Sequence, residues 1–555
     1  MSVELYERAI QPIVDLDSDV IVYVPGYANM GPGEPTLVNA STFTSVFGDA
    51  PYKFVKSQEP TIAKNMAYAT NPEKSWLYAK GLVDAGLTVL YHRCNPSDVG
   101  YAESASGEAL RVSAATTPNN YTSPTGFDTN IYNAGVPNIF AKAKYFGSYY
   151  KDIKVSFEAK GYGLTEVTVK KGATTLETAK ISFDPTSQLY VGDVSFTYIE
   201  LFVKIKVSDN PVTYAEAPFD ALDLSAWYAA TQNAGKALYL NTASNAELTL
   251  ALTDSPEQEF TVKGFEELLA GDNSPIKQLE DTDLYESVTY ITTGGYYQGD
   301  SSTGTIASVA TKVAMDIKSM ALVDLDLTFT IASELGAART SIVNYGISAN
   351  ASKGTTFYGA DTFVIDGYKV VLPDSFGYLQ KLASNIAKAI PPWIPVANNP
   401  QGVVSAIATT RPVGYAVKGE MITDEGISIN PIIYKPSTGY TIMGNRTLFP
   451  TAGVPGPDSF LNCQLVVNTV ARSARRAAQK LLIVSTNAQT AFSNWKSAVS
   501  KTCDKMLVNG DGLSSYNIVK LKKTQPATID VQIELVVVEG LEKFKIYLSY
   551  ALNME

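Results

Sequence analysis

The sequence predicts a mixed α/β, multidomain protein: a layered α/β core with an inserted all-β domain and extended β arms at the N- and C-termini. Short apolar strands alternate with helical stretches before residue 100 and again after about residue 264, which is the pattern of layered α/β domains. Residues 101–230 instead hold short strand candidates separated by Gly, Asp and Pro clusters, which indicates a β-rich insert. The 555 residues suffice for roughly three or four domains.

The N-terminal part is predicted to contain an arm and the first piece of the core. Val20, Ile21, Val22, Tyr23 and Val24 form a continuous apolar strand that a Pro-Gly pair ends. The preceding residues 1–18 cannot form a self-sufficient element, so residues 1–28 are assigned to an N-terminal arm and first strand. A helical stretch from Trp76 to Val83 and the strand LTVLYHRC follow, and residues 29–100 are therefore assigned to the core.

Residues 231–525 are predicted to form the second part of the core. Its expected strands are residues 287–293, 321–329, 426–434 and 440–449. Its expected helices are one near residues 305–320, one that begins near Asp374 as N-cap, and two amphipathic helices, 463–482 and 490–507.

The chain ends in two alternating segments around a Glu-Gly turn, which we assign to a C-terminal β-hairpin arm, residues 526–555. One face of the first strand holds Val531, Ile533, Leu535 and Val537, and one face of the second holds Phe544, Ile546, Leu548 and Tyr550. An isolated hairpin is marginal in water and has open edges. Strand addition between neighbouring copies would satisfy both terminal arms.

Composition disfavours several classes of function. Lys and Arg number 44 against 55 Asp and Glu, for a net charge of −11, so a nucleic-acid binder would need a strongly localised basic patch. Three widely spaced cysteines provide neither a disulfide framework nor a CxxC metal pair. The sequence has no signal peptide, no apolar run long enough to cross a membrane and no GxxxxGK[ST] phosphate loop. We therefore expect no cofactor, no metal site, no membrane insertion and no direct nucleic-acid binding.

The strongest enzymatic alternative is a cysteine hydrolase that uses His92, the only histidine, and Cys94. Positions i and i+2 on a strand merely share a face, and no orienting group is marked nearby, so a structural role is the favoured interpretation. Two further acidic groups could act as acid/base or metal carboxylates, although strand ends and solvated turns explain them better. These are Asp324 with Asp326, and Glu280 with Asp281 and Asp283.

Two charged stripes lie on the predicted C-terminal helices. Arg472, Arg475 and Arg476 follow one helix, and Lys496, Lys501 and Lys505 lie largely off the buried face of the other. Each stripe is either a solvated helix face or a docking surface for an acidic partner, whose charge contribution salt would weaken.

Several segments together resemble the tail sheath protein family of contractile-tailed bacteriophages. The first is VIVYVPGYANMGPGEPTLVNASTFTSVFGDAP, and the second is FAKAKYFGSYYKDIKVSF, which departs from the family's usual Pro-Gly-Glu and Gly-Asn. The strongest block, residues 353–555, contains KGTTFYGADTFVIDGYKVVLPDSFGYL, PPWIPVANNPQGVV and TIMGNRTLF, then the two charged helices and the hairpin. Residues 158–350 share only the general pattern of the family and no specific motif.

The resemblance implies a structural, non-enzymatic subunit that self-assembles as a helical polymer around a tail tube. The extended polymer would be metastable, and its contraction would drive the tube through the host envelope for genome ejection. Implied partners are other copies of this chain, the tail tube protein, and baseplate and tail terminator proteins. The implied location is the virion, after assembly in the host bacterial cytoplasm.

The resemblance also implies roles for the arms and the charged helices. Residues 1–25 and 529–555 would join neighbouring subunits as shared β-sheets by strand exchange. Lys496, Lys501, Asp504 and Lys505 would face the tube, with the Arg472 helix as the alternative, and the β insert would lie outside the core. Two further interpretations remain: the sheath of a tailocin or secretion-type injection system, and another self-assembling virion protein.

Overall fold

The computed structural model describes two compact units. The residues it describes are 20–28, 30–49, 74–94, 102–104, 111–115, 138–145, 148–161, 164–209, 212–218, 237–241, 247–252, 268–271, 274–281, 287–296, 305–324, 334–344, 346–398, 400–409, 421–423, 425–482, 488–507, 512–520 and 531–538. The first unit comprises residues 1–28, 33–95 and 260–555, and the second comprises residues 29–32 and 96–259. Each unit is described by itself below.

The first unit is built on a six-stranded sheet with the order β16-β15-β14-β1-β3-β2. Five of its strands are parallel, and β2 is antiparallel to β3. The strands are β1 (Ile21–Gly26), β2 (Thr36–Val38), β3 (Thr88–Arg93), β14 (Val288–Thr292), β15 (Met320–Leu322) and β16 (Gly354–Thr355). β1 is fully buried, and its unbroken apolar run reflects a central strand that is covered on both faces.

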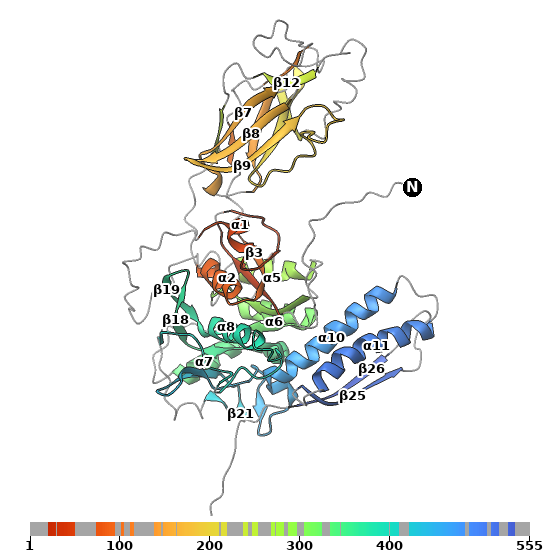
Figure 1. Cartoon of the computed structure of the whole chain (residues 1–555). Helices are drawn as coiled ribbons and strands as arrows, with labels where there is room; N and C mark the ends of the chain where they lie inside the picture. Colours follow the sequence, from red (N-terminus) through yellow and green to blue (C-terminus); the bar gives the residue numbers. More distant parts are fainter. Residues whose placement is uncertain are drawn as a thin grey trace, which may run out of the picture. The chain divides into compact units, whose positions relative to one another are not determined.

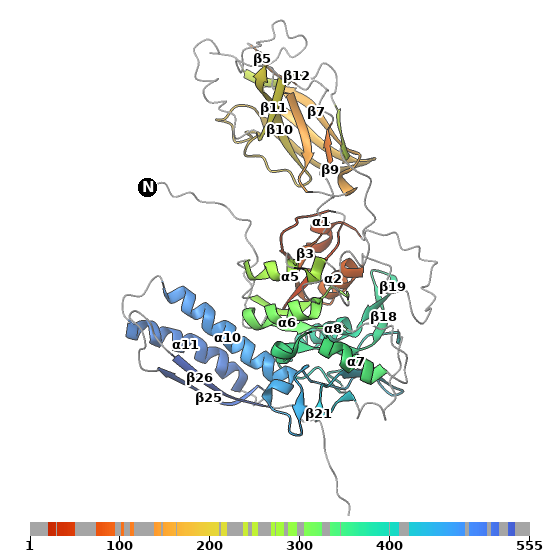
Figure 2. The same ribbon diagram turned by 180° about the vertical axis from the view of Figure 1, so that it is seen from behind.

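Alternate residues of β1 enter two different hydrophobic cores. Val22 and Val24 pack with the first core, while Ile21 and Tyr23 pack with the second, as the two-residue period of a strand requires. The first core includes α2 (Lys74–Asp84) and α8 (Asp374–Ile386), and the second includes α5 (Pro275–Gln278) and α6 (Ile306–Ile317). The sheet is therefore sandwiched between helical layers, as Figures 1 and 2 show from opposite sides.

The rest of the first unit consists of short elements and a long C-terminal module. Its helical elements are α1 (Phe43–Phe47), η4 (Leu279–Asp281), α7 (Glu334–Asn344), η6 (Ser348–Lys353), η7 (Pro457–Ser459), α10 (Leu461–Leu482) and α11 (Ala488–Leu507). Small sheets join β17 (Phe357–Tyr358) to β22 (Asn430–Lys435) and β23 (Gly439–Ile442), and β18 (Ala360–Ile365) to β19 (Tyr368–Pro373) and β20 (Ala408–Thr409). Two-stranded sheets pair β21 (Glu425–Gly426) with β24 (Thr451–Ala452), and β25 (Leu513–Lys520) with β26 (Val531–Val537).

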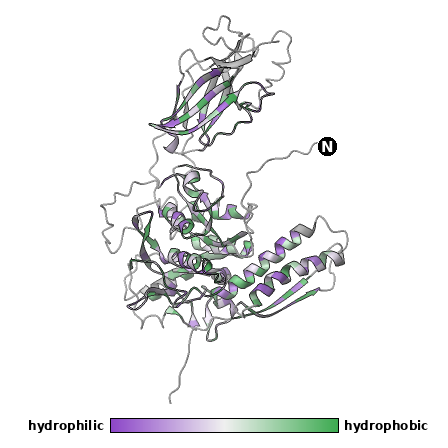
Figure 3. Ribbon diagram, viewed as in Figure 1, coloured by the Kyte–Doolittle hydropathy of each residue, from purple (hydrophilic) through white to green (hydrophobic). Residues whose placement is uncertain are grey.

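The second unit is a ten-stranded antiparallel sheet assembly with its own hydrophobic core. Its strands alternate between hydrophobic and hydrophilic residues (Figure 3), and in β8 every second residue is buried. The elements are β4 (Ala102–Ser104), β5 (Arg111–Ala115), β6 (Asn138–Ala143), η1 (Ser148–Tyr150), β7 (Ile153–Gly161), β8 (Leu164–Lys171), β9 (Thr174–Ser182), β10 (Ile199–Asp209), β11 (Val212–Pro218), β12 (Ala237–Asn241) and β13 (Glu247–Leu252).

The predicted mixed α/β class is confirmed, and the four helices expected after residue 300 are present as α6, α8, α10 and α11. Asp374 is the first helical residue of α8 rather than its N-cap, which is Pro373. The β-rich unit ends at residue 259 rather than 230. The extension has a clear reason: β12 pairs with β5, and β13 pairs with β4 and β7.

Candidate assembly interface

The C-terminal module combines two long helices with a two-stranded sheet. α10 and α11 pack along each other, and β25 contacts α11 while β26 contacts α10 (Figure 1). Trp495 of α11 fixes the helix pair, because its Nε1 donates a hydrogen bond to the carbonyl of Ala474 at 2.8 Å. The module therefore presents a sheet on a rigid helical base.

The two faces of the β25–β26 sheet differ in chemistry. The inner face packs its apolar side chains on the first hydrophobic core, and these are Leu513, Ile518, Val531, Ile533, Leu535 and Val537. The outer face is exposed and largely polar, and there Glu534 accepts hydrogen bonds from Asn517 and Gln532, each at 3.0 Å. Only one face of the sheet is therefore anchored, and its register is fixed by that face.

The edges of this sheet are its most distinctive feature. β25 and β26 form an antiparallel ladder whose register shifts between Leu513 and Ser515, and no other strand of the described residues pairs with either of them. An edge strand presents a row of backbone donors and acceptors that can pair with a strand from another chain. Among the described residues, both outer edges of the sheet are therefore unpaired and suited to strand addition.

The chain leaves β26 through a residue that is held on both backbone groups. The N–H of Val538 donates to the carbonyl of Gly512 at 3.0 Å. Its carbonyl accepts a hydrogen bond from Asn462 Nδ2 at 2.9 Å and a longer contact from Cys463 Sγ at 3.7 Å. Residues 462 and 463 lie in the first turn of α10, so the exit of β26 is fastened to the helical base.

The predicted N-terminal arm needs correction. Ile21 to Val24 belong to β1, which directly follows Val20 and whose two edges pair with β3 and β14 of the same chain, so this strand cannot be shared with a neighbour. Residues 531–537 form β26, which pairs with β25 on one edge; the predicted pairing with residues 544–550 stays a prediction. Phe544, Ile546, Leu548 and Tyr550, together with residues 1–19, lie outside the described residues.

The predicted lysine surface does not form one face. All four side chains are exposed on α11, but Lys496 donates to the carbonyl of Ile518 at 3.2 Å and Asp504 accepts from the Tyr516 hydroxyl at 2.8 Å. Both of these therefore lean toward β25. Lys505 lies nine positions after Lys496, which at about 100° per residue places it roughly on the opposite side of the helix. Lys501 and Lys505 are also exposed, and of these two only Lys505 lies roughly opposite Lys496.

The arginine stripe is mostly an internal clamp. Arg472 is 6% exposed, and its Nη1 donates to the carbonyls of Lys318 at 2.7 Å and Val288 at 3.3 Å. Arg475 donates to the carbonyl of Asp316 at 3.1 Å. These carbonyls belong to the end of α6 and the start of β14, and cations are favoured at a helix C-terminus. Arg476 is half-buried, so the stripe fastens α10 to the core and is not a solvated face.

Sequence reasoning missed a second part of this clamp. Buried Lys353 donates to Gln464 Oε1 at 2.8 Å and Asn468 Oδ1 at 2.6 Å, and Asn468 Nδ2 donates to the carbonyl of Ser319 at 3.0 Å. Burial lowers the pKa of Lys353 to about 8. The signal in the sequence was the pair of amides at positions 464 and 468, four residues apart on one helix face.

We predict that Arg472→Met lowers the free energy of unfolding by about 1–3 kcal/mol, because the partly buried Lys318 carbonyl loses its charged donor, while the Val288 carbonyl keeps the Ser319 hydroxyl. Arg472→Lys should recover only part of the loss, because an ammonium lacks the guanidinium's fork of donors. Urea unfolding followed by tryptophan fluorescence measures the change. Lys501→Met, on the exposed side of α11, is the matched control, and equal unfolding midpoints for Arg472→Met and Lys501→Met would contradict the clamp.

His92 and Cys94 are placed for packing rather than nucleophilic catalysis. His92 Nδ1 lies 2.8 Å from the Tyr23 hydroxyl, which itself donates to the carbonyl of Pro275 at 2.9 Å. Burial lowers the pKa of His92 to about 4, and burial raises the pKa of the Cys94 thiol. A catalytic cysteine needs the reverse shift. The Cys94 Sγ instead donates to the carbonyl of His92 at 3.1 Å.

The carboxyl edge of the parallel sheet, where α/β enzymes commonly hold ligands, is filled by the chain itself. Strand order reverses between β1 and β14, which is the usual place for a binding crevice. There the Ser75 hydroxyl accepts hydrogen bonds from Tyr27 N at 3.0 Å and from the Tyr296 hydroxyl at 3.3 Å. Lys74 Nζ lies 4.6 Å from the centre of the Tyr296 ring. These side chains occupy the crevice.

Asp324 belongs to a buried carboxyl cluster that also includes Asp361 and Asp374, all at most 2% exposed. Its Oδ2 accepts a hydrogen bond from Thr293 at 2.9 Å. Burial, then the charges of Asp361 and Asp324, raise the pKa of Asp374 well above its ordinary value. In the described parts of the chain, no three His, Cys, Asp or Glu side chains are grouped so as to hold a metal ion. Glu280 is exposed beside Asp281 in η4, and Asp283 and Asp326 lie outside the described residues.

No helix among the described residues combines the length and the apolar character needed to cross a membrane.

No family model and no curated protein matches this sequence. Among solved structures, the chain is similar to the contracted sheath complex of the extracellular contractile injection system PVC, at 19% identity over 50% of this chain and 75% of that chain, with a TM-score of 0.38. It is also similar to the contracted helical sheath of the anti-feeding prophage, at 13% identity over 54% and 84% of the two chains, with a TM-score of 0.36. A chain of that particle's contracted baseplate gives 18% identity over 49% and 76%, with a TM-score of 0.39.

Proposed function

We propose that this chain is the structural subunit of a contractile tail sheath. Copies polymerise around a tail tube in a metastable extended state and shorten to drive the tube through the host envelope. The order of the sequence segments that resemble phage tail sheath proteins supports this proposal. Baseplate and terminator proteins would then lie at the two ends of the polymer, and the assembled particle would be a virion.

The observation that carries the proposal is the β25–β26 sheet, neither outer edge of which pairs with another strand of the described residues. A lone two-stranded sheet is marginal in water, yet this one is held on α10 and α11 by a continuous apolar face. Its edges are therefore presented rigidly to strands from other copies. Strands added on both sides would convert it into a larger sheet shared among subunits.

We assign the exchanged arms to residues 1–19 and 541–555. The support is that β1 pairs on both edges and β26 on one edge within the chain. Phe544, Ile546 and Leu548 alternate with polar or aromatic residues, so an added strand would turn these three toward the helical base. We assign the tube contact to Lys501 and Lys505, whose positive charge suits an acidic partner surface.

Negative-stain electron microscopy of the purified chain, alone and with tail tube, tests the proposal. Hollow, helically striated tubes are expected. Closed shells, or single subunits even on added tube, would reject a sheath.

We predict that Phe544→Ser/Ile546→Ser/Leu548→Ser abolishes tube formation while the thermal unfolding midpoint of the subunit stays unchanged. The reason is that the arm would lose the apolar face with which an exchanged strand packs on the neighbouring subunit. Lys543→Ser/Lys545→Ser changes the opposite face and is the matched control, which should still form tubes. Normal tubes from the triple variant would show that this arm does not join subunits.

A further inference from the structure

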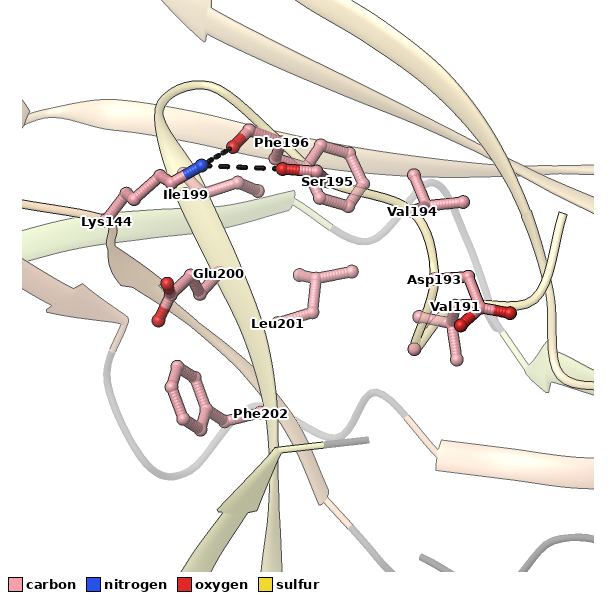
Figure 4. Close-up of a pocket in the computed structure, with 11 residues that line it drawn as sticks. Lys144, Val191, Asp193, Val194, Ser195, Phe196, Ile199, Glu200, Leu201 and Phe202 are labelled. Atoms are coloured by element: carbon pink, nitrogen blue, oxygen red, sulfur yellow. Dashed lines mark hydrogen bonds between the residues drawn. The ribbon is translucent and has the colours of Figure 1, made fainter. Parts of the chain in front are cut away.

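A surface pocket of about 290 Å³ opens in the second unit. It lies where the loop of residues 191–196 passes over the start of β10 and the exit of β6 at Lys144 (Figure 4). Small-molecule pockets usually measure about 300–1,000 Å³, so this pocket lies at the lower end of that range. A pocket of this size accommodates one small ring rather than a peptide or a long chain.

The floor of the pocket is apolar and firmly packed. Val191 and Phe196 are 5% exposed, and Ile199 is fully buried; these residues belong to the hydrophobic core of the second unit. Phe202 is half-buried at one side of the pocket. These core residues back the pocket but present almost no surface to a ligand, so the apolar contact available to a ligand comes mainly from the partly exposed Phe202 ring.

The rim of the pocket is polar and carries more negative than positive charge. Lys144 Nζ donates to the carbonyl of Phe196 at 2.8 Å and lies 3.4 Å from Ser195 Oγ, so two of its three N–H groups are already directed at protein atoms. The carboxylates of Glu200 and Asp193 line the same pocket and are exposed. The rim thus offers acceptors for hydroxyl groups and disfavours an anionic ligand.

We propose that this pocket binds a single uncharged pyranose ring. A pyranose combines an apolar C–H face, which suits the Phe202 ring, with a ring of hydroxyl groups that donate to carboxylates and accept from an ammonium. A free sugar and the end of a polysaccharide both present such a ring, so either could be the ligand. This site goes beyond the sheath proposal and does not depend on it, because it lies wholly within the second unit.

Saturation-transfer NMR on the full chain tests the site with methyl α-D-glucopyranoside and methyl β-D-galactopyranoside at millimolar concentrations. Transfer to the ring protons of at least one of these is expected. The anionic sugar N-acetylneuraminic acid should show little transfer. Dextran distinguishes the two sources, since transfer to its chain ends indicates a polysaccharide and transfer to the free glycoside alone indicates a small sugar.

Two variants localise the binding. Phe202→Ala and Glu200→Gln should each weaken the responding glycoside about tenfold or more, a loss of about 1.4 kcal/mol or more. Glu158→Gln on β7 is the matched control for a surface carboxylate and should bind as the original chain does. Unchanged thermal midpoints establish that the variants are folded. Absence of transfer from both glycosides, equal binding by the Phe202→Ala variant, or equal transfer to the anionic sugar would overturn the proposal.

Discussion

Replacing Gly294 by Ala is expected to destabilise the first unit by more than about 4 kcal/mol, at the extreme of single substitutions. Gly294 follows β14 and has a φ of +66°. A Cβ there would lie closer than 3.0 Å to the carbonyl oxygen of Pro25. That oxygen belongs to β1, which is held on both sides by β3 and β14. Neither partner of the clash can move without disrupting the central sheet.

Gly367→Ala is the matched control for this substitution. Gly367 also has a positive φ, +79°, but nothing lies within 4 Å of the position of its Cβ. Only the backbone conformation is then penalised, at about 1–2 kcal/mol. The difference between the two unfolding midpoints in urea isolates the cost of the close approach. Equal shifts would show that the Pro25 carbonyl imposes no constraint.

Asp324→Asn is expected to stabilise the chain at pH 8 by about 3 kcal/mol and to have almost no effect at pH 4. Burial raises the pKa of Asp324 from 3.8 to about 6, an effect that hydrogen bonds from Ser375 and Thr293 and the charge of Lys74 only partly offset. A shift of about two units corresponds to roughly 3 kcal/mol.

The direction of the pH effect follows from which state binds the proton more tightly. The Asp324 carboxyl has a higher pKa in the folded state than in the unfolded state. Its protonation therefore stabilises the folded state fully below pH 3.8, and this stabilisation is lost as the pH rises through about 6. An asparagine resembles the protonated, neutral side chain at every pH. The stability difference between variant and original chain should therefore grow from pH 4 to pH 8.

Asp366→Asn provides the control, because Asp366 is an exposed turn residue and asparagine tolerates its positive φ of +50°. Paired urea titrations at pH 4, 6 and 8 give the difference for each variant. Asp324→Asn also removes a charge that raises the pKa of Asp374, and this coupling adds to the expected stabilisation as the pH rises. If the stability difference between Asp324→Asn and the original chain did not change with pH, the proposed dependence of stability on the ionisation of Asp324 would be contradicted.

Local patterns predicted the elements well, while their partners depended on distant parts of the chain. The apolar spacing along α10 and α11 reports on one helix at a time, so both helices were predicted within about two residues. The alternation of residues 531–537 shows which face of the strand is buried, but it does not reveal that β25 pairs with one of its edges.

The Arg472 clamp shows the same limit for a site. Arginines at positions 472, 475 and 476 indicate a polar helix face, and such a face is normally solvated. Its role follows from the unsatisfied carbonyls at the end of α6, more than 150 residues away. For His92, by contrast, the sequence was sufficient. No residue that could orient it for catalysis was marked nearby, so the sequence already favoured a role in packing.

The fastening of Val538 has a mechanical consequence. Any tension applied through the residues that follow β26 first reaches a backbone amide and carbonyl that are bonded to Gly512 and Asn462. The force therefore passes into the first turn of α10 and, through Arg472, into the central sheet. β26 does not have to peel from β25 one bond at a time. A pull on the C-terminus would be borne by the body of the subunit as a whole.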